Sequence, residues 1–480
     1  MNVHLRIASR AASWLAVGAL CVGAPACSIP PGRAEIVATE RDVAPTTAPA
    51  PRGAALRRAA PSEEQQLLVR RVDEIESAIT RRPLVGGNEV TLLVNGPATH
   101  AAQLAAIARA RHHIHLITYI LADDELGQKY RDALIERARA GVRVRMIYDG
   151  FGGVTVGSAY LDALERAGIE VHVYSSINPL EQPEVWRYSQ RNHRKILIVD
   201  GRVAFTGGIN IVDNYEKSTG SYKKSTASGS SERGWRDTQI RIAGPAAAEF
   251  QRLFFADWER EVAPIRDDAD YWPALRARGG DWVRAVAKQG ADVSDQVRSR
   301  IARLWPVHFD RKRHAIYASY LAAISESRKR VWITQAYFAP NAEFRDALAS
   351  AARRGCDVRL LVPANSDIGL VYHASRHEYT PLLRAGVRIF EYEGTVLHAK
   401  TAVVDGVWST VGSSNLDYLS FIHNDEANAT IIGHAFAREM ERMFESDLAN
   451  AREVTLDAWR ERPIRDRVLQ SLASKLKYWI

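Results

Sequence analysis

Two copies of one pattern of reactive side chains stand out in the sequence. Each copy has a histidine, a lysine two residues later and an aspartate five residues after the lysine. They are His193, Lys195 and Asp200, and then His398, Lys400 and Asp405. In an extended strand, residues i and i+2 point to the same face, so each histidine and its lysine project together. An imidazole can act as nucleophile or proton carrier and an ammonium can neutralise an anion, so each copy offers half of a phosphate site.

The residues after each pattern predict a hairpin that returns to the histidine. Asp200-Gly201 and Asp405-Gly406 favour two-residue turns, followed by strands at 203–206 and 407–411. Segments rich in small residues come next, and they contain Gly207, Gly208 and Asn210 in the first copy and Gly412, Ser413 and Asn415 in the second. We expect their backbone N–H groups to approach an anion closely. We interpret the two aspartates as structural supports of the turns and not as proton carriers.

The elements around the two patterns form an internal duplication. Residues 101–148 predict helix, strand, helix and strand (101–110, 114–119, 127–140 and 142–148). Residues 314–362 predict the same order, with strands at 331–334 and 357–362 and a helix at 341–354 between them. Alternating helices and apolar strands predict an α/β fold. A separation of about 210 residues indicates two duplicated domains, because solenoid repeats recur every 20–50 residues. The alternative, two histidines packed in a core, leaves this pairing unexplained.

The segments outside the duplication divide the chain further. Residues 1–27 predict an export signal, with Cys27 placed like a lipoprotein site; one uncleaved anchor helix is the alternative. Residues 28–62 predict a linker, 63–261 the first domain, 262–300 a solvated connector and 301–450 the second domain. Within the first domain, 215–233 predicts a mobile loop. In the tail, 451–480, the residues Leu469, Leu472, Leu476, Trp479 and Ile480 lie at helical spacing among basic residues. This pattern predicts an interfacial amphipathic helix or a helix that packs on a domain.

Composition limits the kind of partner and the kind of site. The chain has 480 residues, a formal net charge of +8 and a pI near 9.3, which favours an anionic partner such as nucleic acid or acidic lipid. Three cysteines can build neither a disulfide framework nor a cysteine zinc site. Other candidate metal clusters are interpreted as solvated or packed residues; they are Asp267, Asp268 and Asp270, then His112, His113 and His115, then His373 and His377.

The paired patterns resemble the signature of the phospholipase D superfamily, and other stretches resemble its bacterial cardiolipin synthases. These stretches are Thr118-Tyr119-Ile120, Trp235-Arg236-Asp237-Thr238, Ala336-Tyr337-Phe338-Ala339-Pro340 and Asn415-Leu416-Asp417. The resemblance implies two phospholipase D-like domains, each a mainly mixed β-sheet flanked by helices. It also implies that the domains pack about a pseudo-twofold axis with the site at their interface.

The resemblance further implies a two-step covalent mechanism without metal or cofactor. His193 would attack phosphorus, and His398 would act first as acid and then as base. Lys195, Lys400, Asn210 and Asn415 would neutralise the phosphate oxygens, with Gly208 and Ser413 in support. Each histidine also needs an acceptor on its other ring nitrogen. We expect Glu426 to fill that role in the second half and Asp237 in the first; surface carboxylates are the alternative.

The expected function is phosphatidyl transfer, in which two phosphatidylglycerols give cardiolipin and glycerol. Phospholipid hydrolysis, a nucleic-acid phosphodiesterase and a non-catalytic binding module are the alternatives. The export signal and the basic amphipathic tail favour lipid, so we expect an anionic membrane surface as partner and no nucleic acid. The expected location is the bacterial cell membrane, with peripheral or lipid-anchored attachment after export. The oligomeric state stays open.

Overall fold

The structure is a computed structural model, and it describes residues 62–178, 190–216, 234–265, 269–275, 280–287, 315–366 and 368–476. The predictions for the export signal, for Cys27, for residues 217–233 and for Trp479 and Ile480 lie outside the described residues. The same holds for almost all of the 28–62 linker and for the end of the connector. Ser62 is described, and it caps the first helix, which begins at Glu63.

The first half of the chain alternates helices and strands. Its elements are α2 (Glu63–Thr80), β1 (Val85–Val94), α3 (Asn95–Ala108), β2 (His113–Thr118), α4 (Glu125–Arg139), β3 (Arg143–Asp149), α5 (Ser158–Arg166), β4 (Glu170–Tyr174), β5 (Ile196–Val199), β6 (Val203–Gly207), β7 (Thr238–Ala243), α6 (Ala247–Glu261) and β8 (Asp281–Ala287). The helices and strands predicted between residues 101 and 148 are confirmed within a few residues at most ends; the first helix begins earlier, at Asn95.

The second half repeats this order. Its elements are α8 (Ala315–Glu326), β9 (Arg330–Gln335), α9 (Ala342–Arg353), β10 (Asp357–Pro363), α10 (Gly369–His377), α11 (Tyr379–Arg384), β11 (Arg388–Tyr392), β12 (Lys400–Val404), β13 (Trp408–Gly412), β14 (Ala427–Ile432), α12 (His434–Leu448), β15 (Ala451–Val454), α13 (Leu456–Arg460) and α14 (Ile464–Lys475). Equivalent helices also begin alike. The side chain of Asp124 caps α4 and that of Asn341 caps α9, each accepting a backbone N–H three residues later.

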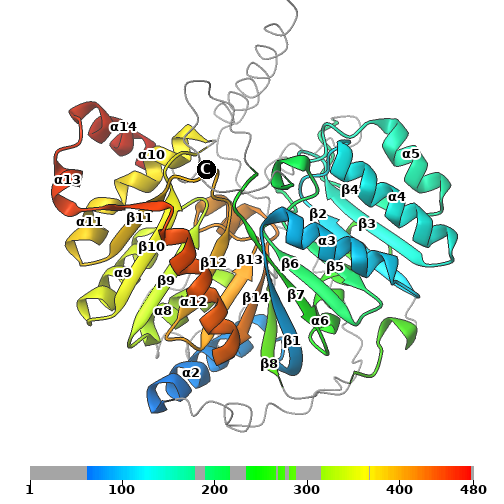
Figure 1. The fold of residues 1–480 in the computed structure, drawn as a ribbon, viewed down its shortest axis with the longest axis horizontal. Coiled ribbons are helices and arrows are strands. Elements are labelled where there is room, and N and C mark those ends of the chain that lie inside the picture. Colours follow the sequence, from blue (N-terminus) through cyan, green and yellow to red (C-terminus); the bar gives the residue numbers. More distant parts are fainter. Residues whose placement is uncertain are drawn as a thin grey trace, which may run out of the picture. The chain divides into compact units, whose positions relative to one another are not determined.

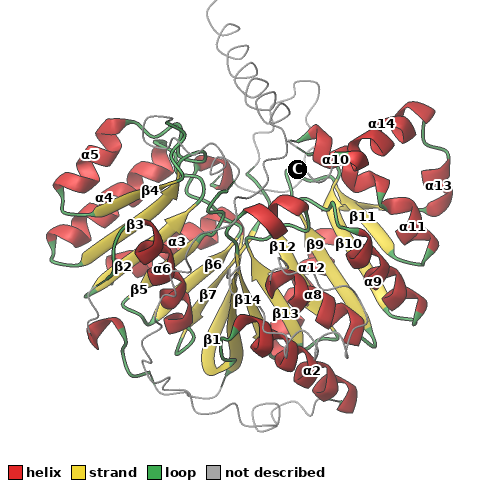
Figure 2. Cartoon of the chain, turned by 180° about the vertical axis from the view of Figure 1, so that it is seen from behind, coloured by secondary structure: helices red, strands yellow, loops and turns green. Residues whose placement is uncertain are grey.

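All described strands join one 15-stranded mixed sheet whose order is nearly palindromic. From one edge it runs β4-β3-β2-β5-β6-β7-β1, and from the other β15-β11-β10-β9-β12-β13-β14-β8. In each half three parallel strands continue into an antiparallel hairpin, and β1 and β8 pair antiparallel where the halves meet. Helices cover the sheet in each half (Figures 1 and 2). The predicted α/β fold with two related mixed-sheet halves is confirmed, and the strand order is that of a pseudo-twofold relation.

The segment predicted as a solvated connector contributes a central strand. In β8 the side chains of Val283 and Ala285 are fully buried, and the strand pairs with β14 and β1. The strand was not predicted because the charged residue Arg284 interrupts its apolar sequence. The Arg284 side chain is buried against α2. There its guanidinium donates to Asp73 at 2.5 Å and to Glu76 at 2.8 Å. A buried charge needs such partners, and a local sequence pattern does not show them.

Helix α2 belongs by packing to the half that follows it by more than 200 residues. Its apolar side chains, among them Leu68 and Val72, share a core with Tyr320 and Leu321 of α8. A helix from the first half of the sequence therefore belongs to the core of the second half of the fold. No helix in the described part of the chain is both long enough and apolar enough to cross a membrane.

Candidate active site

Two short backbone bridges carry the histidines to the boundary between the halves. His193 donates its N–H to the carbonyl of Asp425 at 2.9 Å, and His398 donates its N–H to the carbonyl of Arg236 at 2.8 Å. Each bridge is parallel and joins the residue before a histidine to the residue before a carboxylate of the other half: Asn192 to Asp425, and Leu397 to Arg236. Both histidines therefore lie beside an acidic residue that comes from the opposite repeat.

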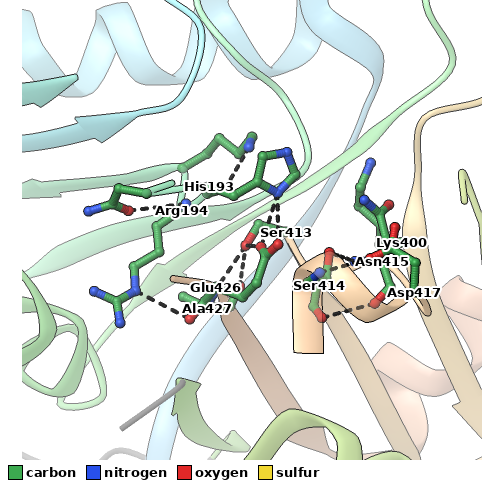
Figure 3. Close-up of polar contacts among 12 residues, drawn as sticks. His193, Arg194, Lys400, Ser413, Ser414, Asn415, Asp417, Glu426 and Ala427 are labelled. Carbon is green, nitrogen blue, oxygen red and sulfur yellow. Dashed lines mark hydrogen bonds and ion pairs between the residues drawn. The ribbon is translucent and has the colours of Figure 1, made fainter. Parts of the chain in front are cut away.

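The carboxylate and histidine pairs are crossed between the halves. His193 Nδ1 lies 3.0 Å and 3.1 Å from the two carboxylate oxygens of Glu426, whereas His398 Nδ1 lies 2.7 Å from Asp237. The prediction placed each acid with the histidine of its own half, and that pairing is wrong. Both acids are buried, at 1% exposure for Glu426 and 0% for Asp237, which excludes the alternative of surface carboxylates. Figure 3 shows His193 and Glu426 facing one another.

Each lysine lies with its histidine, as strand geometry predicts. The ammonium of Lys195 donates to the backbone carbonyl of His193 at 2.5 Å and lies 5.0 Å from the centre of the Tyr119 ring. The ammonium of Lys400 donates to the carbonyl of His398 and lies 3.0 Å from that histidine's Nδ1. The exposed fraction is 2% for Lys195 and 1% for Lys400, so both lysine side chains are almost completely buried.

Burial and these lysines hold the imidazoles neutral. Burial lowers the pKa of His193, the charges of Lys195 and Lys400 lower it further, and Glu426 opposes them. Burial and Lys400 lower the pKa of His398 to about 4, against the opposing attraction of Asp237. Burial also lowers the pKa of Lys195 to about 7. Both lysines act on both histidines, as expected for one shared site.

The carboxylate of Glu426 is held in its charged form. Burial alone would raise its pKa, but attraction to His193 and Lys195, together with hydrogen bonds from His193 and Ser413, lowers it. The Ser413 hydroxyl donates to Glu426 at 2.5 Å and accepts the backbone N–H of Ala427 at 3.1 Å. Ser413 is therefore a support for the carboxylate that faces His193.

The small-residue segments do not present free amides to an anion. The N–H of Gly208 donates to Thr238 at 3.0 Å and that of Ser413 donates to Ala427 at 3.0 Å, because both continue the sheet. At Gly208 the absence of a side chain makes room for a carboxylate, since a Cβ there would lie 2.3 Å from an oxygen of Asp237. Our expectation that these backbone N–H groups approach an anion is wrong for Gly208 and Ser413. Their small size instead leaves room for the carboxylates of the crossed pairs.

The two asparagines differ in how their side chains are satisfied. Asn210 accepts the N–H of Ile120 at 3.0 Å and donates to the hydroxyl of Tyr215 at 3.2 Å. The side-chain oxygen of Asn415 has no hydrogen-bond partner although the residue is only 5% exposed. In Figure 3, Asn415 lies beside Lys400. Of the two asparagines, Asn415 therefore has a side-chain oxygen that is available to a bound group.

The two aspartates of the repeated pattern stand at the turns, as interpreted from the sequence. The carboxylate of Asp200 accepts the backbone N–H groups of residues 111–113, and that of Asp405 accepts those of residues 328–330. Asp200, Gly201, Asp405 and Gly406 all have positive φ angles, as a type I′ turn requires. The predicted hairpins are confirmed, with the same difference in each: Val199 pairs with Val203 and Val404 with Trp408, so Arg202 and Val407 lie outside the ladders.

Sequence patterns missed the position of aromatic residues at the site, among them Tyr119 and Tyr215. The Tyr215 hydroxyl lies 3.2 Å from His398 Nδ1, and the Tyr119 ring stands edge-on to His193 with ring centres 4.8 Å apart. Tyr119 lies in one of the stretches that carry the family resemblance, which was its only signal. Two buried ion pairs flank the bridges: Arg194 with Asp257, and Arg236 with Asp447 at 2.6 Å.

The histidine cluster of the first repeat is packed. The ring of His115 stacks on that of Phe254 at 4.4 Å, and His113 Nε2 lies 2.8 Å from the side-chain oxygen of Gln251. Burial lowers the pKa of His113 to about 4. Within the described ranges, no group of three or more His, Cys, Asp or Glu residues is arranged to hold a metal ion.

Comparison with known proteins decides the family. The family described as cardiolipin synthase, PLD-like domain, matches residues 104–219 and 320–448, which contain His193 in the first half and His398 and Glu426 in the second. The cardiolipin synthase of Geobacillus kaustophilus is 34% identical over 83% of this chain and 74% of its own length. The chain belongs to the cardiolipin synthase-type phosphatidyltransferases of the phospholipase D superfamily.

Other relatives extend this likeness. The cardiolipin synthase of Alkalihalophilus pseudofirmus is 32% identical over 86% of this chain and 75% of its own. The crystal structure of the phosphatidylserine synthase of Haemophilus influenzae covers 85% of this chain and 100% of its own, with a TM-score of 0.61 and 12% identity, and this shows a common fold.

Proposed function

We propose that this phosphatidyltransferase makes cardiolipin and glycerol from two molecules of phosphatidylglycerol. The observation that carries the proposal is the crossed arrangement, in which two buried histidines from different repeats each face a carboxylate of the other. The likeness to cardiolipin synthases over most of the chain supports the choice of lipid. The net charge of +8 supports an anionic substrate surface.

In the first step His193 acts as nucleophile. Glu426 accepts a hydrogen bond from the Nδ1–H of His193, which leaves the lone pair on the other ring nitrogen, Nε2. Nε2 forms a bond to phosphorus, and the bond from phosphorus to the glycerol oxygen breaks. His398 gives a proton to that oxygen, and glycerol leaves. The assignment of His193 as nucleophile and His398 as acid rests on the family resemblance, because the two dyads are alike in geometry.

The second step returns the histidine. A hydroxyl of a second phosphatidylglycerol gives its proton to His398 and attacks phosphorus, the P–N bond breaks, and cardiolipin is released. In the empty site the pKa of His398 is about 4, so the imidazole is neutral at pH 7. A lipid phosphate brings a negative charge between the two imidazoles, and it raises their pKa values toward the range where His398 can carry a proton.

The remaining site residues bind the phosphate. Lys195 and Lys400 neutralise the non-bridging oxygens, a role for which their burial beside the histidines suits them. The Asn415 side chain supplies a further polar contact, and Asn210 fixes the loop after β2 through Ile120. Asp200, Asp405, Gly208 and Ser413 act as supports. The enzyme works at a bacterial membrane surface, attached peripherally or through a lipid on Cys27.

The test is incubation of purified protein with phosphatidylglycerol labelled in its head group and, separately, in its acyl chains. We expect cardiolipin and free glycerol, and a labelled phosphatidyl group bound to protein through an acid-labile bond. His193→Ala should lose the bound label and all turnover, and His398→Ala should lose turnover. Phosphatidic acid as the sole product would assign hydrolysis instead. Residual turnover within tenfold of wild type in either variant would refute the two-histidine mechanism.

A further inference from the structure

Exposed aliphatic side chains gather at the edge of the sheet that holds the histidines. Among the described residues, five such side chains lie in loops or at the ends of elements; they are Val94, Val154, Ile177, Val262 and Ile368, with exposed fractions between 38% and 62%. Val94 ends β1, and the next residue, Asn95, donates its N–H to Asp237 at 2.9 Å. This edge therefore combines the catalytic dyads with apolar surface.

Contacts place three more of these loops at the same edge. Val154 follows β3, whose last residue, Asp149, accepts the N–H of Asn192 at 2.9 Å, next to His193. Ile177 follows β4, and Tyr174 at the end of that strand donates to Asp425 at 3.3 Å. Val262 follows α6, where Arg260 also donates to Asp425, at 2.8 Å.

Ile368 is placed by topology. It follows β10, which is parallel to β9, and β9 ends at Gln335 opposite Lys400.

Helix α14 extends this apolar surface. Its exposed aliphatic side chains recur every fourth residue, at Ile464 (76% exposed), Val468 (52%) and Leu472 (54%), with Leu476 (48%) just beyond the helix end. At 100° per residue these four form one stripe, opposite the buried side chains of Gln470 and Ala473. In α14, small and polar side chains therefore face the protein, and large apolar side chains are exposed to solvent.

The buried face of α14 fixes the stripe near the site. Ala473 packs against Ala374 of α10 and against Ala339, which lies two residues after Tyr337. The Tyr337 ring stands 6.2 Å from that of His398. Helices α10 and α14 lie side by side in Figures 1 and 2. Arg465 and Lys475 are exposed and lie beside the stripe, so the outer face of α14 combines apolar and positively charged side chains.

We propose that α14 and the loops at the histidine edge form the surface by which the enzyme docks on an anionic lipid bilayer. This inference rests on the proposed function, since it supplies lipid phosphate directly to the crossed dyads. The apolar stripe enters the boundary between head groups and acyl chains, and Arg465 and Lys475 pair with lipid phosphates. The substrate then reaches the site from the membrane without leaving it.

The experiment compares full-length wild type with the double variant Val468→Gln/Leu472→Gln and with a control, Ala108→Gln. Ala108 is an exposed aliphatic residue at the last turn of α3, which ends at the opposite edge of the sheet. Binding to phosphatidylglycerol/phosphatidylcholine vesicles is measured by sedimentation. Turnover is measured on the same vesicles and on monomeric short-chain phosphatidylglycerol. Hydrogen exchange of residues 464–476, with and without vesicles, reports contact at α14 even if another segment also anchors the chain.

We expect vesicles to protect residues 464–476 from exchange. Loss of two half-exposed aliphatic side chains should weaken vesicle binding about tenfold each. The ratio of vesicle to monomer turnover should fall in the double variant, whereas the control behaves as wild type. Unchanged exchange at α14, or unchanged vesicle binding by the double variant, would overturn the proposal, as would loss of self-association instead of vesicle binding. A wild type that docks through α14 but does not turn over either form of phosphatidylglycerol would refute the proposed function and leave the docking surface standing.

Discussion

The crossed pairs make a specific prediction about Glu426, which stands in the second repeat but should serve the histidine of the first. Glu426→Gln keeps the shape of the side chain and removes its charge. The carboxylate accepts from His193 Nδ1 at 3.0 Å and is buried, so it stabilises the cationic imidazole that forms when His193 bonds to phosphorus. A hydrogen bond to a charged group contributes about 1.5–3 kcal/mol, so kcat should fall about 10- to 150-fold.

Two measurements test this reasoning. The first is kcat and KM on labelled phosphatidylglycerol, where we expect the loss in kcat because the charged imidazole exists only after bond formation. The second is a titration of the histidine ring nitrogens by nuclear magnetic resonance. Because Glu426 raises the pKa of His193, its replacement should lower that pKa further and leave the pKa of His398 unchanged. Asp237→Asn is the matched variant, and it should lower the pKa of His398 instead.

A change at His398 with none at His193 on replacing Glu426 would contradict the crossed geometry. Turnover by Glu426→Gln within threefold of wild type would contradict the energetic argument. Thermal unfolding of both variants separates these outcomes from general loss of structure, because a Gln that keeps its bond to Ser413 should fold.

Three further predictions follow from the supports and the charges. Lys195 has a pKa of about 7, so it is charged below that pH and loses its proton above it; kcat/KM should therefore decline above pH 7, and Lys195→Arg should move this decline to higher pH even if it lowers the maximum. Asp405→Ala should lower stability by about 2–3 kcal/mol in denaturant unfolding, because three backbone N–H groups lose their acceptor, while Asp405→Asn should recover part of it. Gly208→Ala should displace Asp237 from His398 and lower turnover in a folded protein; normal turnover would show that this glycine is not required.

The parts of the fold that recur in the sequence could be predicted from it. The helices and strands of both repeats follow from local periodicity, and their repetition removes most of the ambiguity of single segments. The hairpins after Lys195 and Lys400 follow from Asp-Gly, because both residues take positive φ angles that few other pairs tolerate. These features are local in the chain, and local interactions determine them.

Features that depend on contact between distant segments could not be predicted. The position of β8 depends on Arg284 finding Asp73 and Glu76 about 210 residues earlier, and without them the strand looks like a polar connector. The family resemblance indicates Glu426 and Asp237 as acceptors for the histidines, but it paired each acid with the histidine of its own half. The pairing is made by the two bridges between the halves, where the parallel pairing of Asn192 with Asp425 aligns the next residues on each strand.

The crossed pairing also ties the chemistry to the assembly of the fold. Neither repeat contains a complete dyad, because each histidine takes its acceptor from the other half. If the halves separated, two buried carboxylates would lose their histidine partners at once, and unpaired buried charges are strongly destabilising. The boundary between the halves aligns the site, and the crossed histidine–carboxylate pairs also stabilise that boundary. A substitution at the bridges should therefore lower activity and stability together, whereas changes at the outer face of α14 should leave stability intact.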